Sequence, residues 1–385
     1  MPSVALVASS FLPRVGGVEE HVRHLALTLA ARGWRVAVWA VDRGDEPAHL
    51  PGVTVRYLPA PLPSASPRGV ARFALAAPGA WAEWRAAART DRPDVVHVHC
   101  HGPNGPWATA VARSLGVPLV AGAHGETFMD PVIDRSVALR RGLAWSLRRA
   151  AAVTACSRYA ADDLDRFGGP ACGSVDVVGN GVDLDEAAGA LPGWAPPRYV
   201  LGLGRLVPVK GFDLLVRAFA QACRAGALDD DVRLVVAGDG PERGPLGALA
   251  QELGVGDRVL LPGALTRGEV VAVTAAAEAL VVPSRVEAFG IVVLEGLRAG
   301  VPVVVSSRGG AGEIVTDGVD GLLVDPFAPD ALATALVRLA DPTLRVRLGA
   351  AGRRTVAAWT WDAVADRVEA VYARVTAAAP AEATA

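Results

Sequence analysis

Two glutamates stand eight positions apart in an otherwise apolar stretch, SRVEAFGIVVLEGLRAGVPVV, which covers residues 284–304. On one continuous helix, eight residues rotate a side chain by about 80° and move it about 12 Å, so Glu287 and Glu295 could not share one small ligand group. The pattern predicts a strand end at 280–283, a loop with Glu287, and a helix over 290–299 with Glu295 facing outward from its second turn. A helix start suits a phosphate and carboxylates suit hydroxyls, which together suggest a sugar nucleotide. For either glutamate alone, a solvated or capping position is the simpler interpretation.

Two cations follow a predicted strand in LGLGRLVPVKGFDLLVRAFA, residues 201–220. The strand ends at Gly204 and a helix starts at Phe212, so Arg205 and Lys210 lie on the turn between them. There they could neutralise a diphosphate leaving group. Solvated charge explains either residue alone, but their joint position at a strand end favours the phosphate. The string lacks the third glycine of GxGxxG, so it does not match a dinucleotide fingerprint.

Gly16 and Gly17 lie between the first predicted strand and a helix in FLPRVGGVEEHVRHLALTLAARG. Paired glycines let the backbone approach a ligand closely, although a simple tight turn explains them equally well. His124 directly follows another predicted strand in VAGAHGETF. At a strand end, a histidine can donate to a sugar hydroxyl or take part in proton transfer.

His97, His99 and His101 alternate in VHVHCH and look like a zinc cluster. Alternate residues of a strand share one face but lie about 6.6 Å apart, too far for two of them to bind one ion comfortably. We therefore expect these histidines to line the edge of a ligand cleft, and we expect no metal site. His21 and His24 lie on the predicted helix after the glycine pair and receive no role.

Strand-like apolar runs alternate with helical patterns along 1–181 and again along 198–360, which predicts two parallel sheets with crossover helices. The stretch 182–197 loses this rhythm and is rich in Pro, Gly and Ala, so it is the expected linker. A helix at 361–376 is expected to pack back on the first domain, and 377–385 is expected to be disordered. Ligands bind such sheets at the carboxyl ends of their strands, so a cleft between the domains is the expected site.

Composition sets further limits on the function. The 385 residues are 51% hydrophobic and 20% charged, with a formal net charge of -2 that gives no reason to expect a nucleic acid partner. The four cysteines form no CxxC pair, which suits reduced thiols in a cytoplasmic protein. The start of the sequence reads as a strand and not as a signal peptide, and no apolar run is long enough to span a bilayer. Arginines mixed with tryptophans at 66–89 and 135–150 would allow weak peripheral contact with the inner membrane surface, although arginines flanking a core-facing stripe explain them more simply.

Seven strings resemble, in order, those of glycosyltransferase family 4: PRVGGVEEHV, AHGETF, NGVDLD, GRLVPVKGFDLLVRAF, VVAGDGPER, PSRVEAFGIVVLEGLRAGVPVVVS and GGAGEIVTDGVDGLLVDP. They cover almost the whole chain, and the E-x7-E spacing together with GRL…KG is the specific part. The resemblance implies the α/β GT-B fold, two doubly wound Rossmann-like domains facing across a cleft. It also implies a retaining hexosyltransferase that needs no metal or other cofactor and takes a UDP or GDP sugar. Gly312 is a departure, because the family often has a proline there.

The resemblance also implies roles for individual side chains. Arg205 and Lys210 would hold the donor diphosphate and stabilise the charge that develops on it as it leaves. Glu295 would bind the ribose hydroxyls, and Glu287 would contact the transferred sugar. His124 would lie beside the donor sugar.

Main-chain groups complete the implied donor site. The N–H groups of Gly290 and Ile291 would meet the distal phosphate, Gly17 would approach it from the other domain, and 260–263 would border the base. The implied set consists of His124, Arg205, Lys210 and Glu287 at the reaction centre, with Gly16, Gly17, Gly204, Pro262, Gly263, Phe289, Gly290, Ile291 and Glu295 around the donor.

The expected partners are a nucleoside-diphosphate sugar and an acceptor hydroxyl on a small molecule, a secondary metabolite, an inositol or aminocyclitol, or a lipid-linked glycan. A nucleotide-sugar epimerase on the same scaffold is the first alternative, and the E-x7-E spacing gives it no support. A NAD-dependent dehydrogenase is less compatible because GxGxxG is absent. A binding protein without catalysis is the third alternative, although all of the polar groups expected of an enzyme are present.

Overall fold

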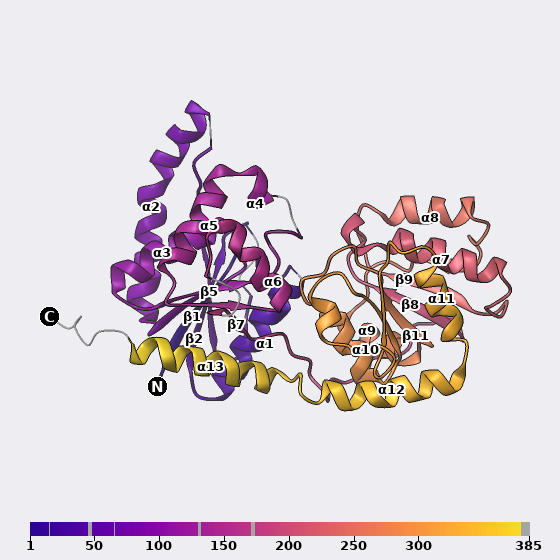
Figure 1. Cartoon of the computed structure of the whole chain (residues 1–385). Coiled ribbons are helices and arrows are strands. Elements are labelled where there is room, and N and C mark those ends of the chain that lie inside the picture. The colour runs from indigo at the N-terminus through magenta and orange to yellow at the C-terminus, as the bar shows by residue number, and fades with distance from the viewer. Residues whose placement is uncertain (15, 45–47, 65, 130–131, 171–173, 379–385) are drawn as a thin grey trace. The chain divides into compact units, whose positions relative to one another are not determined.

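The chain, in a computed structural model, divides into two compact units (Figure 1). The first unit consists of Met1–Asn180 with Trp361–Ala385, and the second is Gly181–Thr360. The structure describes residues 1–14, 16–44, 48–64, 66–129, 132–170 and 174–378. Most of the segment expected to be disordered, from residue 379 onward, therefore lies outside the described residues.

The first unit is built on a seven-stranded parallel sheet in the order β3-β2-β1-β4-β5-β6-β7. The strands are β1 Ser3–Ala8, β2 Arg35–Val41, β3 Val53–Leu58, β4 Val95–His99, β5 Leu119–Ala123, β6 Ala152–Ala155 and β7 Asp176–Val177. Alternate residues of β1 enter two different cores, with Val4 and Leu6 in one and Ala5 and Val7 in the other. Burial on both faces explains why the strand reads as a continuous apolar run.

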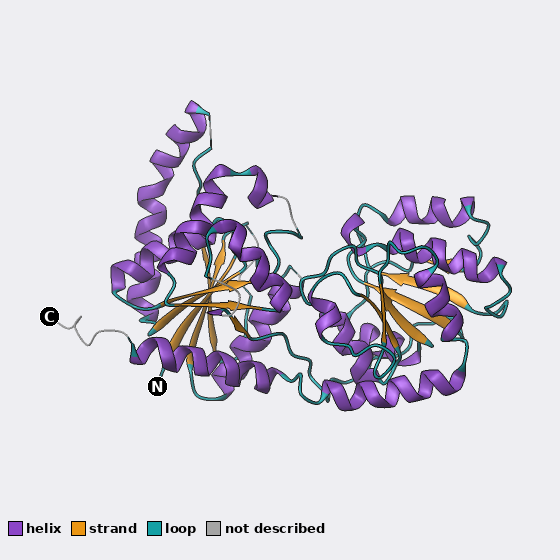
Figure 2. Cartoon of the chain, in the orientation of Figure 1, coloured by secondary structure: helices purple, strands orange, loops and turns teal. Residues whose placement is uncertain are grey.

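Helices cover both faces of this sheet (Figure 2). One face packs against α1 Gly17–Ala31 and α13 Trp361–Ala377, and the other against α2 Pro67–Asp91 and α3 Asn104–Leu115. The remaining helical segments of the unit are α4 Val132–Arg135, α5 Val137–Arg149, α6 Arg158–Asp163 and the 3-10 helix η1 Leu164–Phe167. The helix that the sequence places at 361–376 thus supplies part of the first unit's core.

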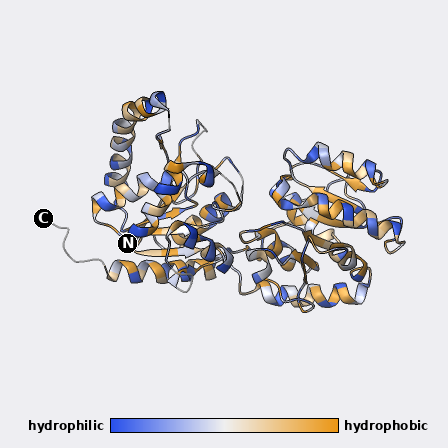
Figure 3. Cartoon of the chain, turned by 45° about the horizontal axis from the view of Figure 1, so that its top comes forward, coloured by the Kyte–Doolittle hydropathy of each residue, from blue (hydrophilic) through white to orange (hydrophobic). Residues whose placement is uncertain are grey.

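The second unit contains a six-stranded parallel sheet in the order β10-β9-β8-β11-β12-β13. Its strands are β8 Tyr199–Leu203, β9 Arg233–Ala237, β10 Val259–Leu260, β11 Ala279–Val282, β12 Val303–Ser306 and β13 Leu322–Val324. Its helices are η3 Pro208–Lys210, α7 Phe212–Arg224, α8 Arg243–Glu252, α9 Arg267–Ala276, α10 Ile291–Ala299, η4 Gly310–Glu313, α11 Ala331–Arg338 and α12 Pro342–Val356. Hydropathy changes from residue to residue along the helices (Figure 3), as expected where one face packs on a sheet and the other meets water.

Both sheets run outward in two directions from a central pair of strands, so the predicted doubly wound α/β architecture is confirmed. The order reverses between β1 and β4 in the first unit and between β8 and β11 in the second. Ligands of open α/β sheets bind outside the carboxyl ends of the strands at such a reversal. None of the helices in the described part of the chain combines the length and apolar character that a membrane span requires.

Candidate active site

The reversal of strand order in the second unit brings one predicted cation, Lys210, to one predicted carboxylate, Glu287. β8 and β11 are hydrogen-bonded neighbours that end at Leu203 and Val282. The loop after β8 carries Arg205 and leads through η3 to Lys210, and the loop after β11 carries Glu287. Two segments about eighty residues apart in the sequence therefore meet at one sheet edge.

Lys210 and Glu287 form an ion pair there, with 2.6 Å between Nζ and Oε2. The Ser284 hydroxyl donates a second bond of 3.1 Å to the same carboxylate oxygen. Glu287 is only 5% exposed, and these two donors compensate the energetic cost of burying its carboxylate. Lys210 is also the only lysine in the sequence, since every other basic side chain among the 38 Lys and Arg residues is an arginine.

The backbone around Glu287 is held by a glycine on the neighbouring loop. Glu287 pairs with Gly309 in an isolated parallel bridge, and its carbonyl accepts a bond of 2.8 Å from the Gly310 N–H. Gly309 has a φ of 109°, and a Cβ there would lie 2.2 Å from the Glu287 carbonyl oxygen. Any side chain at this position would therefore push the Glu287 loop away.

The N-terminus of α10 follows directly after this loop. Gly290 occupies the N-cap with a φ of 87°, a left-handed conformation that glycine adopts without strain. It has no side chain to cap the first N–H groups, which leaves the positive end of the nine-residue helix available to an anion. α10 begins at Ile291 and ends at Ala299 before Gly300, as the sequence predicts.

Glu295 does not face outward as expected, and this prediction is wrong. It is 3% exposed and forms an ion pair with Arg267, whose guanidinium also contacts Glu186 at 2.5 Å. Arg298 donates to the second oxygen of Glu186 at 2.6 Å. Burial raises the pKa of the Glu295 carboxyl above its ordinary value, and the charge of Arg267 opposes that rise only in part.

The other predicted donor residues of the second unit lie in the loops that follow β8, β10 and β11. Arg205 is exposed beside Gly204, and Gly263 accepts a bond of 2.8 Å from the Gly238 N–H. Pro262 precedes Gly263 in a loop whose Leu261 carbonyl accepts a bond from Arg243. Phe289 is buried and packs on Trp359 with 5.5 Å between ring centroids, so only its main chain could reach a ligand.

The glycine pair of the first unit lies where β1 connects to α1. Gly16 is the N-cap of α1 and Gly17 is its first residue. A Cβ at Gly17 would meet no atom within 4 Å, whereas one at Gly16 would lie 2.6 Å from Glu19 Oε2. The described neighbours thus leave open space at Gly17.

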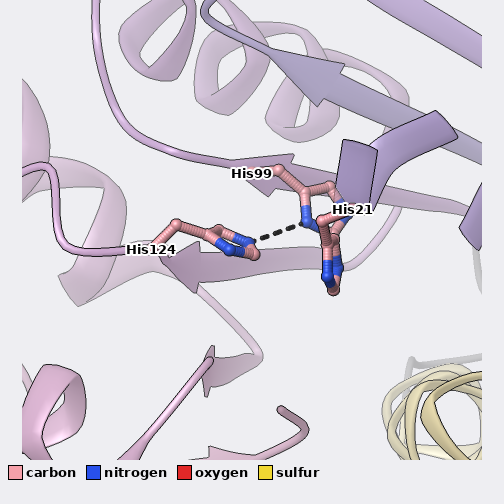
Figure 4. A group of neighbouring side chains, drawn as sticks. All are labelled: His21, His99 and His124. Carbon is pink, nitrogen blue, oxygen red and sulfur yellow. Dashed lines mark hydrogen bonds between the residues drawn. The ribbon is translucent and has the colours of Figure 1, made fainter. Parts of the chain in front are cut away.

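His124 follows the last residue of β5 and is joined to His99, with 3.1 Å between His124 Nε2 and His99 Nδ1 (Figure 4). Its main-chain N–H donates to Glu126, which also accepts from the His101 N–H. Burial lowers the pKa of His124 to about 4, although the Glu126 charge opposes this, so its imidazole is neutral at pH 7.

The alternating histidines do not line an open edge, contrary to expectation. His97, His99 and His101 are 0%, 1% and 4% exposed. Both ring nitrogens of His97 have partners, the Tyr372 hydroxyl at 2.7 Å and the Thr154 hydroxyl at 3.2 Å. Among the described residues, one group could hold a metal through its side chains: His21, His99 and His124, here called the histidine triad.

Sequence reasoning missed two participants. Arg267 was overlooked, although TRGE at 266–269 is a capping-box pattern that places Arg267 at a helix start. His21 received no role, because nothing local shows that the α1 position meets the ends of β4 and β5.

An α/β unit with an uncapped helix start beside a Lys210–Glu287 ion pair at its strand reversal has the construction of a nucleotide-sugar-dependent glycosyltransferase of the GT-B type. A model described as Glycosyltransferase Family 4 matches residues 15–186, and one described as Glycosyl transferases group 1 matches residues 193–355. The chain belongs to glycosyltransferase family 4 and is a glycosyltransferase enzyme.

Named relatives agree with this assignment over nearly the full length. The chain is 34% identical over 393 residues to D-inositol 3-phosphate glycosyltransferase 1 of Catenulispora acidiphila, covering 93% of this chain and 90% of that protein. It is 33% identical over 402 residues to the GDP-mannose-dependent alpha-(1-6)-phosphatidylinositol monomannoside mannosyltransferase of Mycobacterium tuberculosis, covering 96% and 97%. These relatives give no support to the epimerase and dehydrogenase alternatives.

Solved structures support the fold. Sucrose-phosphate synthase from Thermosynechococcus elongatus matches with a TM-score of 0.77 and 26% identity, over 98% of this chain and 100% of that one. Anabaena HepE, solved with UDP and glucose, matches with a TM-score of 0.76 and 20% identity, over 97% and 100%. The expected GT-B fold is thereby confirmed.

Proposed function

We propose that this glycosyltransferase moves a hexose with retention of anomeric configuration from a nucleoside-diphosphate sugar to a hydroxyl of an inositol-containing acceptor. The Lys210–Glu287 pair beside the uncapped start of α10 is the observation that carries the donor half. The pair brings a cation and a carboxylate to one strand reversal, and this supports assigning the cation to the diphosphate and the carboxylate to sugar hydroxyls.

In the proposed reaction, the bond between the sugar and the diphosphate breaks through an oxocarbenium-like transition state. Lys210, Arg205 and the N–H groups at Gly290 and Ile291 stabilise the negative charge that grows on the leaving phosphate. The departing phosphate takes the acceptor proton as the new bond forms on the same face. Transfer then needs no metal, because fixed cations and helix N–H groups neutralise the leaving group.

The single lysine supports a specific role for an ammonium at position 210. Elsewhere this chain uses the planar, forked guanidinium, whereas an ammonium is a compact point charge with three rotatable donors. When a donor binds, the Lys210 ammonium can turn from the Glu287 carboxylate to a phosphate oxygen, freeing Glu287 for the sugar hydroxyls. An arginine there would hold Glu287 through two bonds.

The remaining donor contacts are proposed from the family resemblance. Glu295 binds the ribose hydroxyls after its pairing with Arg267 rearranges, residues 260–263 border the base, and His124 and Gly17 of the first unit contribute near the sugar and the phosphate. The GDP-mannose dependence of the mycobacterial relative makes GDP-mannose the first donor to test, with UDP sugars beside it.

The acceptor proposal rests on the relatives' names, because both name an inositol compound as part of the reaction. A lipid-linked inositol would bring the first unit to a membrane surface. α2 has exposed apolar side chains at Val70 and Leu75, and α5 carries four exposed arginines, Arg140, Arg141, Arg148 and Arg149. We propose weak peripheral contact through these helices, which vesicles containing phosphatidylinositol would detect by co-sedimentation.

Transfer is tested by incubating purified protein with GDP and UDP sugars and with inositol phosphates or phosphatidylinositol vesicles, with and without a chelator. We expect one donor and one inositol acceptor to give product, no effect of the chelator, and a product anomeric configuration by NMR that matches the donor. Release of free sugar only, or product with the opposite configuration, would contradict the proposal.

The donor site is tested separately by amine labelling. An N-hydroxysuccinimide ester can acylate only two amines in this chain, the Lys210 side chain and the N-terminus, so the N-terminus is an internal reference. A saturating nucleoside diphosphate should slow labelling of Lys210 and not of the N-terminus. Equal labelling with and without nucleotide would remove Lys210 from the diphosphate site.

A further inference from the structure

Three imidazoles converge where the strand order of the first unit reverses. His21 comes from α1, His99 is the last residue of β4, and His124 follows β5. Figure 4 shows His99 and His124 directed toward each other, with the His21 ring beside His99. One ring nitrogen from each residue lies within 4.8 Å of the other two, and the His99–His124 distance of 3.1 Å is already close to the ~3.3 Å between ligands of a tetrahedral zinc ion.

A second, independent observation concerns the tautomer of His21. Its Nδ1 lies 2.5 Å from the Asn180 amide oxygen, which can only accept a hydrogen bond. Nδ1 therefore carries the proton and Nε2 presents a lone pair. That Nε2 is buried without a hydrogen-bond partner in the described part of the chain. An N–H held by an amide oxygen, opposite a free lone pair, is the arrangement of a metal-binding histidine with its supporting partner.

A negative charge near the histidine triad also favours a cation. Glu126 is buried next to His124, and its two carboxylate oxygens accept hydrogen bonds from the main-chain N–H groups of His101 and His124. A carboxylate then stands close to the triad as a counter-charge.

We propose that the histidine triad binds one divalent transition-metal ion of the zinc type through three imidazole nitrogens. Imidazole ligands favour Zn²⁺, Co²⁺, Ni²⁺ and Cu²⁺ over Mg²⁺ and Ca²⁺. His97 is not a ligand, because Tyr372 and Thr154 occupy its nitrogens. Binding requires the His21 ring to move by about 1–1.5 Å toward the other two. This site is additional to the proposed transfer, which does not require it.

The test uses the full chain after chelator treatment, without donor or acceptor, so that its result does not depend on the transferase proposal. Co²⁺ is titrated while visible absorption is recorded, because a tetrahedral Co²⁺ site absorbs far more strongly than the aqueous ion. Zn²⁺ is titrated by calorimetry and by its effect on the melting temperature. We expect one equivalent of either ion to bind and the melting temperature to rise.

Variants locate the ion. His124→Ala changes the least buried member of the triad and should weaken binding by roughly 100-fold or more, whereas Asn180→Leu removes only the partner of His21 and should weaken it by roughly 10–100-fold. His49→Ala removes an exposed histidine of the same unit and should bind as the unaltered protein does. Metal-free melting curves show which variants are folded.

The proposal is overturned if the unaltered protein binds neither ion above the level of weak surface binding. It is equally overturned if folded His124→Ala and Asn180→Leu both bind as tightly as the unaltered protein, or if His49→Ala alone abolishes binding.

Discussion

Mild acid is expected to destabilise the first unit selectively. All seven histidines lie at or before residue 124, so the second unit, Gly181–Thr360, contains none. Burial lowers the pKa of His97 to about 3 and that of His124 to about 4, and it lowers those of His21 and His99 well below the ordinary value. In the unfolded chain each would titrate near a pKa of about 6.5.

The sign of the effect follows from the protons bound in each state. Between about pH 6.5 and 4 the unfolded chain binds protons that the buried histidines of the folded chain do not bind. The free energy of unfolding therefore has its full value above that pH window and decreases as the pH falls through it. At about pH 5, which is about 1.5 pH units below the pKa of the unfolded chain, each such histidine lowers the free energy of unfolding by about 2 kcal/mol, because one pH unit corresponds to about 1.4 kcal/mol. His97 and His124 together give about 4 kcal/mol, a large share of the ~5–15 kcal/mol of a typical domain, and His21 and His99 act in the same direction.

Urea unfolding of the chelator-treated protein at about pH 7.5 and about pH 5 measures this difference. Tryptophan emission reports mainly the first unit, because only Trp194 and Trp359 of the nine tryptophans lie in the second. Hydrogen exchange, read peptide by peptide and corrected for its intrinsic pH dependence, follows the second unit in the same samples. We expect the urea midpoint of the first unit to be lower at about pH 5 than at about pH 7.5, and that of the second unit to be the same at both. The control variant His49→Ala should show the same pH response as the unaltered protein. Equal first-unit midpoints at the two pH values would refute the reasoning, because the imidazoles would then not be buried in their neutral form.

Three further outcomes are expected. Lys210→Ala and Glu295→Ala should each lower kcat/KM by about 100-fold or more, on the order of 3 kcal/mol, with folding intact. The control Glu252→Ala, on the exposed end of α8, should leave kcat/KM unchanged. Near-normal rates in both Lys210→Ala and Glu295→Ala would remove the donor-site assignment. Added Zn²⁺ should inhibit transfer and a chelator should restore it, because the ion occupies a histidine proposed to act on the donor sugar; full activity with the triad saturated would contradict this. Tyr372→Phe should destabilise the first unit by about 1–3 kcal/mol, because it removes the hydroxyl that forms a hydrogen bond with His97. Thermal unfolding measures this, and an unchanged melting temperature would mean that the bond contributes nothing to stability.

The elements that sequence reasoning predicts well are those set by local chemistry. The sequence predicts a helix over 290–299, and α10 runs over Ile291–Ala299. The alternation of apolar runs and helical patterns likewise sufficed for two parallel sheets, because strands covered on both faces need near-continuous hydrophobic residues. Placing Arg205, Lys210 and Glu287 at strand ends needed no more than this.

The failures concern contacts between distant residues. Glu295 was expected at the surface because a lone carboxylate is usually solvated, yet Arg267, 28 positions earlier, makes its burial tolerable. His97 was expected at an open edge because the alternation of residues along a strand predicts which face of the sheet a side chain is on, and it does not predict which element packs on that face. The cover is α13, which comes from the far end of the sequence and supplies Tyr372. Such partners follow from the tertiary fold and leave no local pattern.

The return of α13 to the first unit has a consequence for protein synthesis. The second unit is one continuous segment, so all of its residues have been synthesised before Trp361 is added. The first unit, although translated earlier, lacks the residues of α13 that complete its core, Val364, Val368, Tyr372 and Val375 among them, until that helix emerges. Domains generally fold as units in the order in which they are made. Here the nascent chain would complete its second unit first, while one face of the earlier sheet stays open to chaperones.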